Sequence, residues 1–109
     1  MYIRIQNKTI RFRVSVIEAK RLLDGEVLRD SLPLSNEISL AYEVRISESN
    51  SSFNYASESN SIILLVDRKK LAYETTIRPT KTGIAFKEII GAKQLSVSLE
   101  IDMKKPKDL

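Results

Sequence analysis

The sequence predicts an α+β domain built on a mainly antiparallel sheet, or a partly closed sandwich, of about seven strands with two short helices. Three observations carry this prediction. Apolar and polar residues alternate in several segments, only two segments have helical patterning, and most connections are too short for the crossovers that parallel strands need. The chain has 109 residues, of which 42% are hydrophobic, so it fits one globular domain with a single core.

Residues 1–14 are predicted to form a hairpin of two strands. Pairing Ile5 with Ile10 brings the apolar side chains of both strands onto one face. A two-residue turn at residues 7–8 and a four-residue loop over residues 6–9 both give this register. The wider loop is preferred, because the lysine in the shorter turn is poorly suited to the positive φ of a primed turn.

A helix is predicted at residues 15–24. Ser15 is its candidate N-cap, and Glu18 three residues later completes a capping box. Gly25 is well placed to end the helix in the left-handed conformation. The apolar stripe of the helix consists of Val16, Ala19, Leu22 and Leu23.

The rest of the chain adds further strands and a second helix. The predicted strands are at residues 26–31, 38–46, 53–55, 62–66, 83–90 and 95–103. Asp67 can cap the second helix, which is predicted to end near residue 75. Serine-rich segments and a loop over residues 77–82 that contains Pro79 separate these elements. No internal sequence repeat is evident.

One domain over residues 1–103 and a basic flexible tail over residues 104–109 are predicted. The formal net charge is +4, and the three lysines and one aspartate of the tail contribute +2 of it. The body therefore carries only +2, less than proteins that track a phosphate backbone usually concentrate on one surface. Nucleic-acid binding through an arginine face and the lysine tail therefore has less support than the favoured function described below.

The chain contains no cysteine and no histidine. This excludes a disulfide framework, a thiolate metal site and a cysteine nucleophile, and it removes the commonest general base. The three glycines form no phosphate loop or dinucleotide fingerprint, so we expect no enzyme activity, cofactor or metal. Because no apolar leader and no run of about 20 apolar residues is found, we expect a cytoplasmic protein that does not contact membranes.

One set of residues that could carry chemistry lies on the polar face of the predicted hairpin. In the predicted register Arg4 lies opposite Arg11, and Arg13 follows on the same face. Like charges in this arrangement need compensation. Carboxylates on neighbouring strands would provide it, whereas unpaired arginines would form an anion-binding face. The candidate residues for this anion-binding or structural salt-bridge face are Arg4, Arg11, Arg13, Glu43, Glu100 and Asp102.

Two other interpretations of Glu100 and Asp102 have less support. On a strand their side chains would stand about 6.5–7 Å apart, a spacing that some glycosidases use, but nearby arginines would keep both carboxylates ionised. Two carboxylates without a dense acidic loop also make a poor site for magnesium or calcium. Neither catalysis nor metal binding is therefore assigned to this pair.

The favoured function is a small non-catalytic binding or protein-interaction module. The small size, the missing catalytic groups and the exposed sheet edges expected of such a fold support it, with a homodimer or another protein as the partner. Nucleic-acid binding is the alternative. An enzyme or sensor for a small anionic ligand, held by the three arginines, has the least support.

Two segments of the chain carry a further pattern. The first is Ile3-Arg4-Ile5, Asn7, Ile10-Arg11-Phe12-Arg13 and then Ser15 with Glu18, and the second is Gly83-Ile84, Gly91 and Leu99-Glu100-x-Asp102. Together they resemble an uncharacterised family of small bacterial proteins, a domain of unknown function with a basic N-terminal hairpin, a capping-box helix and a C-terminal Leu-Glu-x-Asp strand. The resemblance covers about half of the chain and implies the same architecture with no established activity. Met103 stands where family members tend to carry an aromatic residue, and the cysteine often found nearby is absent.

Overall fold

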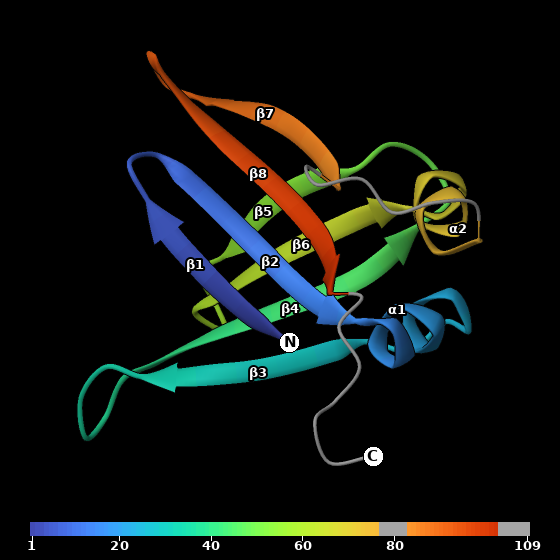
Figure 1. The fold of residues 1–109 in the computed structure, drawn as a ribbon. Helices are drawn as coiled ribbons and strands as arrows, with labels where there is room; N and C mark the ends of the chain where they lie inside the picture. The colour runs from blue at the N-terminus through green and yellow to red at the C-terminus, as the bar shows by residue number, and fades with distance from the viewer. Residues whose placement is uncertain (77–82, 103–109) are drawn as a thin grey trace.

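The structure, a computed structural model shown in Figure 1, describes residues 1–76 and 83–102. In chain order its elements are β1 (Tyr2–Gln6), β2 (Thr9–Ser15), α1 (Val16–Leu23), β3 (Leu28–Pro33), β4 (Ser39–Ser47), β5 (Ser52–Ala56), β6 (Ser61–Asp67), α2 (Arg68–Thr76), β7 (Ile84–Ile90) and β8 (Lys93–Asp102). Each of the eight strands overlaps a segment predicted as a strand, so the count exceeds the approximate total of seven by one. The predicted loop around Pro79, the predicted domain end at residue 103 and the tail lie outside the described residues.

The strands form two four-stranded sheets that face each other. Sheet A has the order β1-β2-β8-β7, and sheet B has the order β3-β4-β6-β5. Each sheet consists of two antiparallel hairpins joined in the middle by one parallel pair, β2 with β8 in sheet A and β4 with β6 in sheet B. The α+β class with mostly antiparallel pairing is confirmed. The two parallel pairs were not expected. The prediction rested on connections between consecutive strands, which are too short for a parallel crossover, whereas each parallel pair joins strands of two different hairpins.

The topology contains a repeat that the sequence does not reveal. A hairpin, a helix and a second hairpin occur twice, first as β1-β2-α1-β3-β4 and then as β5-β6-α2-β7-β8, and each unit contributes one hairpin to each sheet. When the strand ends Ser15 and Asp67 are taken as equivalent, Phe12 and Val14 correspond in place to Leu64 and Val66. The two units share apolar spacing but few identities, which explains why no sequence repeat is evident.

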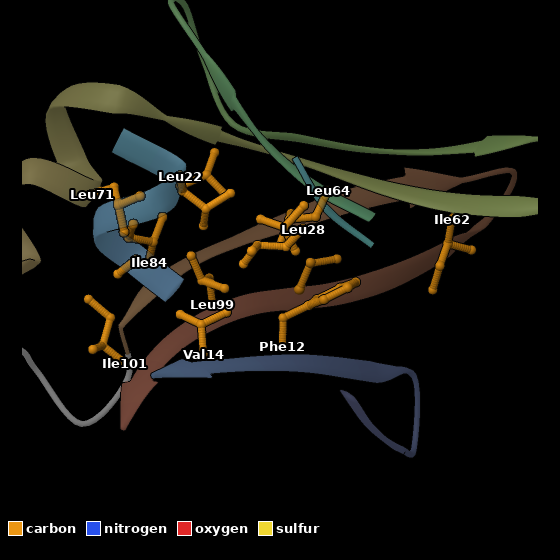
Figure 2. Close-up of a cluster of buried hydrophobic side chains, with 14 residues drawn as sticks. Phe12, Val14, Leu22, Leu28, Ile62, Leu64, Leu71, Ile84, Leu99 and Ile101 are labelled. Carbon is orange, nitrogen blue, oxygen red and sulfur yellow. The ribbon is translucent and has the colours of Figure 1, made fainter. Parts of the chain in front are cut away.

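The core lies between the sheets and is closed by the helices at one end. Figure 2 shows Phe12, Val14 and Leu99 of sheet A directed toward Leu28 and Leu64 of sheet B. Both helices lie at one end of the sandwich, and the four hairpin turns lie at the other (Figure 1). Burying a side chain of this size stabilises a fold by about 1.5–3 kcal/mol, so these contacts hold the sheets together. Leu22 and Leu71 are the fully buried helix residues that face this core with Ala19.

The first hairpin has the predicted register but not the preferred loop. Ile5 pairs with Ile10, and Arg4 pairs with Arg11. The strands are joined by a two-residue turn in which Asn7 has φ of 44° and Lys8 has φ of 61°. Positive φ at both positions is the geometry of a primed turn, whose twist matches that of the flanking strands. The preference for the wider loop was therefore wrong, because strand twist outweighs the poor suitability of a lysine for positive φ.

Both helix starts follow the predicted capping chemistry. The Oγ atom of Ser15 accepts a hydrogen bond from the Glu18 N–H at 3.1 Å, and Glu18 Oε1 accepts one from the Ser15 N–H at 2.9 Å. This is the predicted capping box, and Gly25 follows with φ of 93° as expected. At α2 the Asp67 carboxylate accepts from the Lys69 N–H at 2.9 Å. The helices are thus anchored at the strand ends from which they start.

Candidate functional site

Sheet A has a polar outer face, turned away from sheet B, on which the three predicted arginines lie together. Arg4 of β1 lies directly opposite Arg11 of β2, and Arg13 lies two residues further along β2. Arg13 donates a hydrogen bond from Nη1 to the hydroxyl oxygen of Tyr2 at 3.2 Å. The alternation of apolar and polar residues thus places all three guanidinium groups on one surface.

The acidic strand β8 lies beside these arginines. Because β2 and β8 pair in parallel, Glu100 lies next to Arg13 in register, while its carboxylate reaches Arg11, with Nε to Oε2 at 3.1 Å. Asp102 Oδ2 lies 4.0 Å from Arg13 Nε. Two of the three arginines are therefore compensated by carboxylates. Arg4 makes no ion pair with any residue of the described parts of the chain.

Glu43, the third predicted carboxylate, belongs to sheet B and does not join the arginine face. Its side chain is 5% exposed, and its Oε2 accepts a hydrogen bond from Arg45 Nη2 at 2.6 Å. Its Oε1 accepts another from Arg29, the residue opposite it on β3. The hydrogen bond from Arg45 is the main cause that lowers the pKa of Glu43, and the charge of Arg29 adds to it against the effect of burial. This cluster links β3 to β4 and engages both oxygens of the Glu43 carboxylate.

An open pocket of about 280 Å³ lies on the same outer face of sheet A, over β8 and between β2 and β7. Its polar lining consists of Thr9, Arg11, Lys87, Ser96, Ser98 and Glu100. Sequence reasoning found Arg11 and Glu100 but missed Thr9, Lys87 and the two serines. The alternation along β7 and β8 shows that they share a polar face, but only the pairing of β2 with β8 brings them beside Arg11.

The two open sides of the sandwich differ. On the side of β5 and β7, Glu88 Oε1 accepts a hydrogen bond from the backbone N–H of Phe53 at 3.2 Å, which links the sheets. On the side of β1 and β3, no hydrogen bond or ion pair joins these two strands, both of which are described in full. There Ile5 is 64% exposed and Leu32 is 50% exposed, although both side chains lie on the faces turned toward the core. The sequence gives no sign of this difference, because both pairs of edges have similar apolar patterns.

Within residues 1–76 and 83–102, no three acidic side chains lie close enough together to hold a metal ion. In the same residues, neither helix has the length and apolar character that crossing a membrane requires. Glu100 is engaged by the ion pair with Arg11. The described geometry thus offers binding surfaces and an ion-paired face.

These features define a small α+β sandwich of two hairpin–helix–hairpin units, with an ion-paired outer face on one sheet. On one side of it, no hydrogen bond or ion pair between described residues joins the two edge strands. The chain belongs to a family of unknown function, DUF7009, whose sequence profile matches residues 1–106. Membership of a family without known function is as the resemblance implied. No curated protein and no solved structure matches the chain. The comparisons therefore assign no function to it.

Proposed function

We propose that the protein is a non-catalytic protein-interaction module of the bacterial cytoplasm that binds a partner along β1, the free edge of sheet A. The observation that carries the proposal is the difference between the two sides of the sandwich. Glu88 caps the edge of β5, whereas the edges of β1 and β3 have no such cap in the described residues. Unpaired backbone groups at a sheet edge readily accept an added strand.

The side chains of β1 indicate which strand would fit. Ile5 is largely exposed on the inner face, so an apolar partner residue there would cover it and gain about 25 cal/mol for each Å² of apolar surface removed from water. Arg4 lies on the outer face and has no carboxylate partner among the described residues. A partner strand that alternates apolar and acidic residues would therefore match both faces of β1. A second copy of this chain fits less well, because antiparallel pairing of two β1 strands brings two arginines near each other.

The geometry of the outer face of sheet A supports nucleic-acid binding less than the composition of the chain does. Arg11 and Arg13 each lie near a carboxylate of β8, so among the three arginines of the described outer face only Arg4 has no carboxylate partner. A protein that follows a phosphate backbone needs several free cations along one track. The protein-interaction proposal needs only Arg4, Ile5 and the backbone of β1.

The test uses a short extended peptide of alternating valine and glutamate and ¹⁵N-labelled full-length protein. Saturable amide shift changes should concentrate in β1 and its neighbour β2. Replacement of Arg4 by glutamate should remove binding, because the partner carboxylates would then be repelled. The matched control is Lys20→Glu, which makes the same change in net charge on an exposed position of α1.

Shift changes that fall on other elements, or equal loss of binding in both variants, would contradict the proposal. A matching peptide of alternating valine and lysine should not bind the wild-type protein, since it would place like charges beside Arg4. Binding of both peptides with similar affinity would show that the contact is not directed by β1.

A further inference from the structure

We propose that the pocket over β8 is a binding site for a small phosphate-containing molecule, with a phosphate monoester as the class of ligand. This site lies on the outer face of sheet A and uses residues separate from the exposed edge described above. Three features of the pocket support this assignment, namely the shape of its floor, two cations at its walls and three hydroxyl groups. Each of these features follows from the register of β2, β8 and β7.

The pocket exists because small residues occupy the centre of the sheet. Ser96 and Ser98 lie on the outer face of β8, and Ala85 lies beside Ser98 on β7. The next position along this face of β7 would be Gly83, which has no side chain. Longer side chains stand on either side of this floor. A hollow therefore forms on a sheet surface that would otherwise be flat.

The walls of the pocket supply positive charge from two strands. Arg11 of β2 lies beside Ser98 and Lys87 of β7 lies beside Ser96, on opposite sides of β8. Two strand spacings across the sheet and two residues along it place their backbones about 12 Å apart. Glu100 forms an ion pair with Arg11 through Nε, and no hydrogen bond to the terminal guanidinium nitrogens is found within the described residues. Lys87 has no ion pair there either. The pocket thus carries two cations against one carboxylate.

The hydroxyl groups give the site its preference among anions. Thr9 and Lys87 lie on either side of Ser96 in the sheet, so a hydroxyl, a second hydroxyl and an ammonium group form one row. Ser98 adds a third hydroxyl in the next row. None of the three hydroxyl groups is hydrogen-bonded to another described residue, so each can donate to a ligand.

A phosphate group matches this set of donors. Its non-bridging oxygens can accept hydrogen bonds from the hydroxyls and charge-assisted bonds from Lys87 and the free end of Arg11. A volume of about 280 Å³ is larger than phosphate alone requires, which leaves room for an attached organic group. It lies just below the usual range for ligand pockets of about 300–1,000 Å³, which indicates a small ester.

The first experiment titrates full-length ¹⁵N-labelled protein with inorganic phosphate and, separately, with glycerol 3-phosphate, at constant ionic strength maintained with chloride. Saturable shift changes should centre on the amides of Thr9, Ser96, Ser98 and Lys87. The ester should bind at least as tightly as inorganic phosphate. Lys87→Gln should weaken binding about tenfold or more, because it removes a charge-assisted contact.

Two further variants separate a formed pocket from general charge attraction. Lys93→Gln makes the same charge change on β8 outside the pocket lining and should leave the affinity unchanged. Ser98→Val keeps every charge but fills the floor and removes one donor, so it should weaken binding while the protein stays folded. The proposal is overturned if no saturable change occurs, if Lys93→Gln weakens binding as much as Lys87→Gln, or if Ser98→Val has no effect.

Discussion

Arg4 and Arg11 lie directly opposite each other across the first hairpin, and only Arg11 has a carboxylate partner in the described residues. The parallel pairing of β2 with β8 places Glu100 beside β2. Arg4 lies on β1, one strand further away, and forms no ion pair with Glu100. The two arginines therefore have different roles. Arg11 is part of an ion-paired sheet surface, and Arg4 is an unpaired cation at the edge.

The first prediction concerns the cost of this unpaired arginine. Arg4→Thr should stabilise the protein by about 0.3–0.5 kcal/mol, because it removes the repulsion across the hairpin and introduces a residue that favours strands. In a domain of this size, that gain corresponds to a rise in Tm of about 2 °C. Urea unfolding monitored by circular dichroism measures the change. Arg4→Lys is the control, since it keeps the charge and should leave the stability nearly unaltered.

The hairpin shows how far sequence reasoning reaches. Matching apolar residues across residues 1–14 fixed the register, and the opposition of Arg4 and Arg11 followed from it. The capping box at Ser15 was equally accessible because its two residues are close in sequence. Features of this kind depend on contacts within one hairpin or one helix turn.

Features that depend on the pairing of distant strands were not accessible. Alternation shows that Glu43 and Glu100 face away from the core, but it does not show that they belong to different sheets. Lys87 was missed for the same reason, because its place near Arg11 depends on the register of three strands from both ends of the chain. The exposed state of Ile5 depends on which edges the sandwich seals. Local alternation thus predicts on which face of a sheet a side chain lies, whereas the pairing of distant strands determines which side chains lie next to it.

The second prediction concerns the buried carboxylate of sheet B. Glu43→Gln should destabilise the protein by about 1–2 kcal/mol, because two guanidinium groups lose charge-assisted hydrogen bonds at a buried position. The loss stays below that of a fully buried ion pair, since both arginines are about half exposed and can be hydrated. Chemical denaturation at pH 7 gives the value. Glu37→Gln, in the exposed loop between β3 and β4, is the control and should change stability little.

The third prediction is the pH dependence of that contribution. The pKa of Glu43 is lowered in the folded protein, mainly by the hydrogen bond from Arg45. An unfolded glutamate has a pKa of about 4.3, so the stabilisation is fully present above about pH 5 and is lost as the pH falls toward the lower folded-state pKa. The stability difference between the wild type and Glu43→Gln should therefore be constant from pH 8 to about pH 5.5 and shrink below about pH 4.5. A difference that grows on acidification would contradict the assigned direction.

The fourth prediction compares two glycines with the same backbone conformation. Gly83 has φ of 62° and Gly91 has φ of 64°, but a Cβ atom at Gly83 would lie 2.1 Å from the carbonyl oxygen of Leu99, whereas one at Gly91 would meet nothing within 4 Å. Gly91→Ala should cost about 1 kcal/mol, from the conformational penalty alone. Gly83→Ala should cost at least about 2 kcal/mol more, because backbone at the start of β7 must move away from β8. Thermal unfolding of the two variants side by side measures the difference, and equal losses would show that the close approach of Gly83 to Leu99 does not constrain the fold.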